Sequence, residues 1–317
     1  MNKMIPMSVI TETLFQSTYM KRKAITEKDI FSLLPSYFYQ KKYNGCYTLL
    51  IIDDYGKAQC FNKNMVTVPN LDNAIMEARN KLSAGRVYLC EAVVYKDSEV
   101  EDFEEASRTF NPNTNTTPDG KVKLVIFDSV TLQEFLKGRS ELGFSDRWAE
   151  LEELSQNYYH FEHIIFAETY FIQSFETLTY IYNKCLTRGD EGAIITHTDS
   201  IWNRRTNNCD TSWKLIPIPT IDLEIVGFKT GKGKHTNVCS TLTYIIPTFL
   251  KEGNPKTFID VDGSLTFDIR KDIAENFEKY KGKISKVSYK GFTRYGKLRQ
   301  PKVLEVARYD KHKADTK

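Results

Sequence analysis

The sequence predicts an α+β fold in two domains, a larger one of antiparallel sheets with helices and a smaller β-barrel. Three observations predict this organisation. The chain has 317 residues, 41% of them hydrophobic, which is enough apolar material for two ordinary cores. Strand-length apolar runs, such as residues 47–52, are followed by hairpin turns. Charge and pattern both change near Asp222, where we place the domain boundary.

The first domain is expected to span residues 1–222. Its first 40 residues predict a helical lead-in, with Thr26 as the N-cap of a helix. Residues 47–52 predict a buried strand that ends in a hairpin turn at 53–57. The remaining predicted elements are helices at 71–82, 132–137, 145–156 and 174–187, strands at 87–95, 123–127, 164–167, 189–196 and 211–228, and a polar loop at 111–120.

The second domain is expected to span residues 223–317. Short apolar strands at 223–228, 236–246 and 284–289 are separated by Gly-rich turns, and one helix is expected at 268–281. About five short strands and one helix in a segment of this length are typical of a small barrel such as the OB-fold.

Charge is divided unevenly between the two domains. The whole chain has a net charge of only +3, from 44 basic and 41 acidic side chains. Residues 1–222 hold 24 basic and 30 acidic side chains, whereas residues 223–317 hold 20 and 11. A basic block attracts polyanions, because neutralising phosphates releases condensed counterions. The second domain is therefore expected either to bind nucleic acid or to carry an ordinary basic surface.

Several classes of protein are excluded. No apolar run approaches the roughly 20 residues that a membrane-spanning helix needs. Residues 1–18 lack the basic start, apolar run and cleavage site of a secretory signal. The six cysteines are scattered without a CxxC pair, so we expect reduced, structural thiols. These features favour a protein without membrane contact in the cytoplasm, or in the host cytoplasm if the source is a virus.

The sequence has neither of the common phosphate-binding loops. The glycine-rich segment at 227–233 fails the Walker A template, and no GxGxxG occurs. A better candidate is Lys42-Tyr-Asn-Gly45, beside the first hairpin. A neutral lysine amine can attack an α-phosphate and form a phosphoramide, and the glycine permits close backbone approach. For so short a pattern, a surface lysine beside a turn glycine is the commoner alternative.

Six segments, in the same order along the chain, resemble the motifs of ATP-dependent DNA ligases, especially the small two-domain bacteriophage type. These enzymes belong to the covalent nucleotidyltransferase superfamily. The first segment, Lys42-Tyr-Asn-Gly45, resembles the motif K-x-D-G. The resemblance extends from Gln40 to Lys311. The other five segments are Leu89-Cys-Glu91-Ala-Val-Val-Tyr95, Ile126-Phe-Asp128, Gly189-Asp-Glu191-Gly192, Ser212-Trp-Lys214-Leu215 and Gly296-Lys-Leu-Arg299-Gln-Pro301.

The resemblance implies an active site in the first domain. Lys42 would be the catalytic lysine that carries AMP, and Lys214 a second catalytic residue that neutralises phosphate charge. Glu191 would help to bind the divalent metal, Mg²⁺ or Mn²⁺. Among the remaining residues, Glu91 would hold the ribose and Phe127 would stack on adenine. The residues expected to bind ATP are Gln40, Lys42, Glu91, Phe127, Lys214 and Arg299.

The resemblance also implies the reaction and its partner. ATP would adenylate the lysine, AMP would pass to the 5′-phosphate of a nick in duplex DNA, and the 3′-hydroxyl would displace it. A monomer would encircle the DNA with its two domains.

Three departures from the family pattern keep other functions open. Asn44 replaces the aspartate of K-x-D-G, Tyr47 replaces a usual arginine, and Ile216 stands where a second lysine is common. An RNA ligase or a capping-type nucleotidyltransferase is therefore an alternative. A catalytically decayed module that only binds nucleic acid is another.

Overall fold

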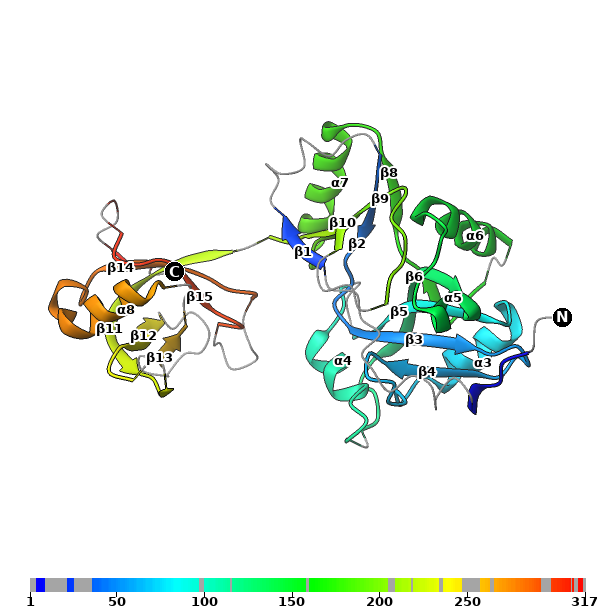
Figure 1. Ribbon diagram of the computed structural model, residues 1–317, viewed down its shortest axis with the longest axis horizontal. Coiled ribbons are helices and arrows are strands. Elements are labelled where there is room, and N and C mark those ends of the chain that lie inside the picture. The colour runs from blue at the N-terminus through cyan, green and yellow to red at the C-terminus, as the bar shows by residue number, and fades with distance from the viewer. Residues whose placement is uncertain are drawn as a thin grey trace. The chain divides into compact units, whose positions relative to one another are not determined.

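The computed structural model describes residues 4–8, 22–25, 36–96, 100–114, 116–157, 160–204, 209–217, 219–233, 236–246, 257–262, 265–291, 298–308, 310 and 313–315. The chain divides into two units, residues 1–216 and 217–317 (Figure 1). The sequence places this boundary at residue 222, which lies inside strand β11 (Thr220–Thr230). The second unit therefore begins a few residues before the point at which the charge pattern changes.

The first unit contains two five-stranded sheets (Figure 1). Sheet I, in the order β4-β3-β5-β6-β7, consists of β3 (Cys46–Ile52), β4 (Ala58–Asn62), β5 (Arg86–Tyr95), β6 (Lys121–Thr131) and β7 (Ile164–Phe166). Sheet II, in the order β1-β10-β9-β2-β8, consists of β1 (Arg22–Ile25), β2 (Tyr37–Lys41), β8 (Thr169–Ile172), β9 (Ala193–His197) and β10 (Cys209–Leu215). Apart from the parallel pairs β1–β10 and β6–β7, neighbouring strands are antiparallel, which confirms the predicted mixture of helices and mainly antiparallel sheets.

The helical lead-in predicted for the first 40 residues is wrong for two of its segments. Arg22–Ile25 and Tyr37–Lys41 are strands β1 and β2 of sheet II. In β2, Tyr37 and Tyr39 are buried while Phe38 between them is half-buried, the alternation of a strand in a sheet. The proposed N-cap, Thr26, lies outside the described residues.

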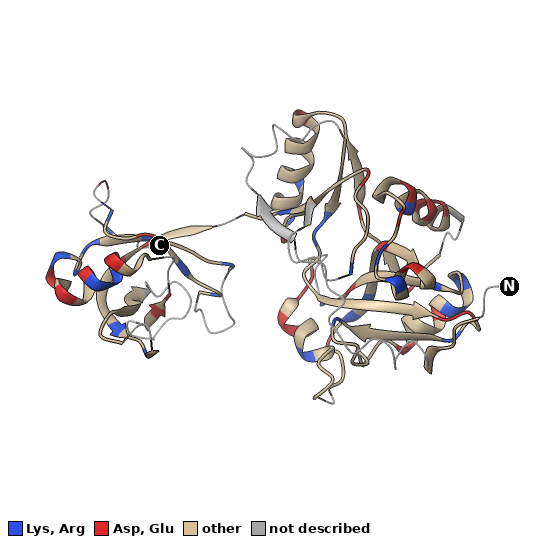
Figure 2. Ribbon diagram, in the orientation of Figure 1, with Lys and Arg blue, Asp and Glu red and all other residues tan. Residues whose placement is uncertain are grey.

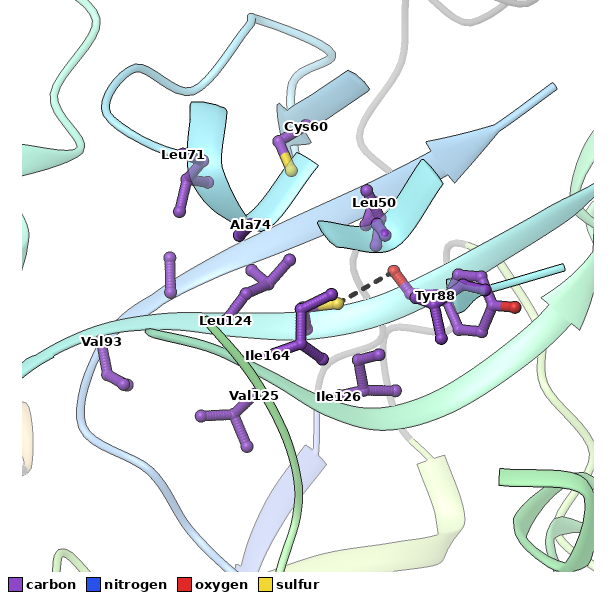
Figure 3. Close-up of a cluster of buried hydrophobic side chains, with 14 of the residues drawn as sticks. Leu50, Cys60, Leu71, Ala74, Tyr88, Val93, Leu124, Val125, Ile126 and Ile164 are labelled. Atoms are coloured by element: carbon purple, nitrogen blue, oxygen red, sulfur yellow. Dashed lines mark hydrogen bonds between the residues drawn. The ribbon is translucent and has the colours of Figure 1, made fainter. Parts of the chain in front are cut away.

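Helices cover both faces of sheet I. One face packs against α3 (Asp72–Lys81), α4 (Phe103–Thr109) and α6 (Phe144–Asn157), and Figure 3 shows its core around Leu50, Leu124 and Ile126. The other face packs against α5 (Leu132–Lys137) and Trp202. Sheet II is covered by α7 (Phe175–Thr187). Each sheet therefore has a core of its own, and Phe38 of sheet II also packs against the core of sheet I.

Helix α5 has the residues 132–137 that the sequence predicts, because its ends are set locally. Thr131 and Glu134 form a reciprocal capping box at the start. Gly138, with φ of 84°, ends the helix in the left-handed conformation that glycine adopts without strain.

A buried ion pair attaches α6 to sheet I. Arg147 Nε and Nη2 lie 2.8 and 2.9 Å from the two carboxylate oxygens of Asp128, and both side chains are at most 5% exposed. Arg147 Nη1 also donates to the carbonyls of Leu142 and Ser200. Burial lowers the pKa of Arg147, but Asp128 outweighs this effect and the pKa lies above its ordinary value.

The second unit is a five-stranded antiparallel sheet in the order β13-β12-β11-β14-β15. Its elements are β11, β12 (Cys239–Ile246), β13 (Thr257–Val261), helix α8 (Phe267–Glu275), the 3₁₀ turn Phe277–Lys279, β14 (Ile284–Ser288) and β15 (Lys302–Glu305). The long strand β11 pairs with β14 through its first half and with β12 through its second, where one bulge lies at Val226 of β11 and a second register shift at Ser240 of β12. Among the described residues, no ladder joins β13 to β15, so the predicted closure into a barrel is not seen; one hydrogen bond, from Val303 N to Asp262 O, links the two edges.

The first unit is expected to carry an excess of acidic side chains. In the structure, acidic side chains gather on its helices α4 and α6 (Figure 2). The five cysteines whose side chains are described are free thiols. None of the helices in the described part of the chain has the length and apolar character needed to cross a bilayer.

We predict that Arg147→Met destabilises the first unit by about 3–5 kcal/mol, because it leaves the buried Asp128 carboxylate without its cation. Denaturant unfolding measures the loss. Arg139→Met is the matched control in the same unit, since Arg139 is 55% exposed and pairs with the exposed Glu141. That change should cost less than about 1 kcal/mol. Equal losses in the two variants would contradict the assignment.

Candidate active site

A cavity of about 140 Å³ lies between sheets I and II. It collects side chains from β2 and β9 of one sheet and from β3, β5 and β6 of the other. Four of the residues that the sequence predicts to bind ATP line it together. The lining residues are Gln40, Lys41, Lys42, Tyr43, Tyr47, Glu91, Phe127 and Ile194.

Lys42 lies just beyond the end of β2, and its amine contacts a carboxylate. Lys42 Nζ donates to Glu191 Oε2, and the two side chains are 24% and 23% exposed. The Lys42 backbone N–H also donates to the Gly192 carbonyl, at 2.8 Å. The structure thus brings the predicted nucleophile and the predicted metal ligand into direct contact.

Two glycines allow the backbones around this contact to approach closely. A Cβ at Gly45 would lie 2.2 Å from the Ala92 carbonyl oxygen of β5. A Cβ at Gly192 would lie 2.4 Å from the Leu215 carbonyl oxygen, and Gly192 also has a φ of 141°. No side chain fits in either place without moving main chain, so both motif glycines are required by packing.

Gln40 joins the two sheets across the cavity. The side chain is 3% exposed, and its amide nitrogen donates to the Phe127 carbonyl of β6 at 2.9 Å. The same nitrogen donates to Thr169 Oγ1 of β8 at 3.1 Å. Because both amide donors serve the protein, Gln40 has only its oxygen for an adenine edge.

Phe127 is the inserted residue of a β-bulge. In the β5–β6 ladder Leu89 faces Asp128, and the next residue, Cys90, faces Ile126. Bulges often redirect a side chain next to an active site. Here the bulge turns the Phe127 ring into the cavity, and the Asp128–Arg147 pair anchors the adjacent residue.

Tyr47 lies where the family pattern has an arginine. It pairs with Glu91 across the β3–β5 ladder, so both side chains leave the same face of sheet I and line the cavity. The rings of Tyr47 and Phe127 are 6.3 Å apart and tilted by 45°. This side of the cavity is therefore aromatic with one carboxylate, rather than cationic.

Lys214 projects from the same face of sheet II as two lining residues. Ile194 of β9 faces Gln40 on one side and Lys214 of β10 on the other. Residues opposite one another in a ladder share a face, and neighbouring strands lie about 4.8 Å apart. The Lys214 side chain thus starts one strand beyond the cavity wall, in reach of a ligand larger than the base.

Arg299, the remaining predicted ATP ligand, belongs to the second unit. Its backbone exchanges hydrogen bonds with Lys290 and Gly291. Nearby in sequence, Arg308 forms a two-oxygen contact with Asp222, at 2.9 and 3.1 Å. The contact of Arg299 with ATP remains a prediction.

Sequence reasoning missed the charged side chains behind Lys42. Lys41 is 8% exposed and lies 2.8 Å from Glu101 Oε1 and 2.7 Å from Asp190 Oδ1. The signal was present in the sequence. Two consecutive lysines stand at the end of one strand, and two consecutive acids, Asp190 and Glu191, stand just before the start of another strand. Its interpretation required the pairing of β2 with β9.

Residues 18–214, more than half of the chain, match the family described as ATP dependent DNA ligase domain. The chain belongs to the ATP-dependent DNA ligase family. Members of this family are enzymes that make phosphodiester bonds. The match ends at Lys214, so the ligase family assignment rests on the first unit alone.

Solved structures show the same fold as this ligase-family chain. One, named Pmar-Lig_Pre, is 16% identical with a TM-score of 0.73; the similarity covers 91% of this chain and 66% of that protein, just under two thirds. Another, from a study of DNA binding by Lig E DNA ligases with a minimal scaffold, is 14% identical with a TM-score of 0.66. There the similarity covers 90% of this chain and 98% of the other. Among curated proteins, no sequence matches this chain.

We predict that Gly45→Ala destabilises the first unit by about 1–3 kcal/mol, the usual effect of forcing an extra methyl into packed structure. Thermal unfolding measures the change. In the control, Gly227→Ala, the new Cβ would lie 3.5 Å from the nearest atom, in ordinary contact with Thr243. A Gly45→Ala protein as stable as this control would show that the close approach to Ala92 is not a constraint.

Proposed function

We propose that this chain is an ATP-dependent DNA ligase that seals nicks in duplex DNA through a covalent lysine–AMP intermediate. The observation that carries the proposal is the shared cavity. Gln40, Lys42, Glu91 and Phe127, which come from three distant segments of the sequence, line one space together. The Lys42 amine is suited to the phosphate, the Glu91 carboxylate to the ribose and the Phe127 ring to adenine.

Adenine is proposed to bind against Phe127. The position of Phe127 is fixed by the bulge and by the hydrogen bond from Gln40 to the Phe127 backbone carbonyl. The Gln40 oxygen can accept a hydrogen bond from the amino group of adenine, which guanine lacks at that position. Glu91 can accept hydrogen bonds from the ribose hydroxyls, with the Tyr47 ring beside it.

The triphosphate is proposed to extend past Ile194 toward Lys214. Once deprotonated, Lys42 Nζ forms a bond to the α-phosphorus while the bond to pyrophosphate breaks. Lys214 would offset the negative charge of the phosphates. AMP then passes to the 5′-phosphate of the nick, and the 3′-hydroxyl displaces it and closes the strand.

A divalent ion is proposed to bind at Glu191. Within the described ranges, no three His, Cys, Asp or Glu side chains gather closely enough to hold an ion by themselves. Mg²⁺ commonly binds through one or two carboxylates together with substrate phosphates and water. Glu191 fits this role because it is partly exposed beside Lys42. The bound ion, Mg²⁺ or Mn²⁺, would supply positive charge next to the reacting phosphate.

The second unit is proposed to be an OB-fold that binds DNA. Its support is the bulged strand β11, shared between two halves of one antiparallel sheet, and the helix α8, which contacts β12 of that sheet. The basic excess of residues 223–317 suits a phosphate backbone. Arg299 would reach ATP from this unit, and one monomer would enclose the duplex.

Labelling with α-labelled ATP and Mg²⁺, followed by a denaturing gel, tests the enzyme against a decayed binding module. A covalent label that is then lost on addition of nicked DNA, with the appearance of a sealed strand, supports the proposal. Absence of label favours the binding module. Sealing only of RNA-containing nicks, or labelling by GTP in preference to ATP, would favour the RNA ligase or the capping-type enzyme.

We predict that Lys42→Ala abolishes the label, because alanine has no nucleophile. The change removes a side chain that is about one quarter exposed, so the protein should stay folded. Lys57→Ala, at an exposed lysine in the hairpin after β3, should label like the unchanged protein. Label that survives in Lys42→Ala would assign the attack to another residue.

We predict that Phe127→Leu weakens ATP binding while Phe127→Tyr does not. Leucine keeps apolar volume but loses stacking, which contributes about 0.5–1.5 kcal/mol beyond burial, or roughly 2- to 13-fold in Kd. Calorimetric titration with ATP measures the difference. If the two variants bind ATP equally well, adenine does not stack at this position.

A further inference from the structure

The residue before the proposed nucleophile has a site of its own. Lys41 is the last residue of β2 and lines the cavity beside Lys42, but its amine contacts other carboxylates than the Lys42 amine does. Lys41 Nζ lies 2.7 Å from Asp190 Oδ1 and 2.8 Å from Glu101 Oε1, and neither carboxylate side chain has any exposed surface. The Tyr43 ring covers the amine, with its centroid 4.8 Å away.

Two lysine–acid pairs therefore connect the same two segments. Lys41 pairs with Asp190 on the buried side, and Lys42 pairs with Glu191 on the cavity side. The four residues are two consecutive pairs in sequence, so a shift of Asp190 moves Glu191 with it. The backbone hydrogen bond from Lys42 to Gly192 completes this arrangement.

The two pairs differ in strength because they differ in burial. Breaking a fully buried pair leaves an uncompensated charge in a low-dielectric interior and is strongly unfavourable. The cavity-side pair is about one quarter exposed and is easier to separate. That difference suits the chemistry, since Lys42 has to leave Glu191 to attack ATP while the segments that carry both stay in place.

The charges around Lys41 favour its ionised form. Burial lowers the pKa of Lys41, but Asp190 and Glu101 outweigh it, and the pKa lies above its ordinary value. Asp190 is also held by Arg188, at 2.8 Å, and Arg188 in turn contacts Glu168 at 2.8 Å. Two cations thus face three carboxylates in one connected cluster.

We propose that the buried Lys41–Asp190 pair is a clamp that sets the position of Lys42 and Glu191, and that both of its members are positioning residues for lysine adenylation. This inference rests on the proposed function. Neither Asp190 nor Glu101 lines the cavity, although Lys41 does, so the loss of either carboxylate should affect the attack rather than ATP binding.

Two nearly isosteric variants test the clamp, Asp190→Asn and Glu101→Gln. Each removes one of the two negative charges that contact the same amine, and each side chain is completely buried. Only Asp190 adjoins Glu191. At saturating ATP, Asp190→Asn should form lysine–AMP about 10- to 100-fold more slowly, the range expected for a reacting group displaced by roughly 1 Å. Glu101→Gln should react at nearly the rate of the unchanged protein, and ATP affinity should change little in either variant.

The readouts separate positioning from a general loss of structure. Thermal unfolding of each variant identifies the assay temperature at which both are folded. If Asp190→Asn does not fold, Lys41→Arg replaces it, because the longer guanidinium keeps the charge but shifts the loop that carries Glu191. The clamp predicts a folded Lys41→Arg protein with slower adenylation at saturating ATP.

Other outcomes overturn the inference. Equal slowing in Asp190→Asn and Glu101→Gln, or slowing that follows only the unfolding temperature, would mean that the cluster stabilises the fold and nothing more. An unchanged rate in Asp190→Asn, or in a folded Lys41→Arg protein, has the same consequence. Failure of the unchanged protein to form lysine–AMP would instead refute the proposed function, so the two failures are distinguishable.

Discussion

The hydrogen bond from the Gln40 amide to the Phe127 carbonyl joins the two sheets at the cavity wall, where it sets the geometry of the site. Gln40 belongs to sheet II and Phe127 to sheet I, and each sheet has its own core. Without a fixed distance between the sheets, Lys42 and Phe127 would not share a cavity. The bond is buried, so losing either partner would leave a polar group unsatisfied away from water.

Burial also separates the fixed parts of the site from the parts that are proposed to react. The groups that hold the frame are fully buried: the Asp128–Arg147 pair behind Phe127, and the carboxylates of Asp190 and Glu101 behind Lys42. Lys42 and Glu191 retain access to solvent. A preorganised frame with accessible reactive groups lowers the cost of reorganisation when ATP enters, because the surrounding dipoles and charges are already oriented.

The sequence allows accurate prediction where structure is determined locally. Helix α5 follows from the capping box of Thr131 and Glu134 and from Gly138, all within a few residues. Sheet II was harder to predict, because β1 and β8 have four residues each and exist only through pairing with distant strands. The bridging role of Gln40 depends on a partner 87 residues away, which no local pattern reveals. Motif similarity could bring Lys42, Glu91 and Phe127 to one site, but it could not show the charges packed behind them.

The bulge at Phe127 divides β6 into two stretches of opposite alternation. Before it, Leu124 and Ile126 face the core that contains α3; after it, Val130 faces the core that contains Trp202. A one-residue deletion here would restore a regular ladder and leave the residues that follow on their present faces, but it would remove the inserted Phe127 from the cavity wall. In the divergence of related sequences, the length of this strand should therefore be kept even where the identity of its residues changes. The spacing between the ring proposed to bind adenine and helix α5 would thus change more slowly than the residues themselves.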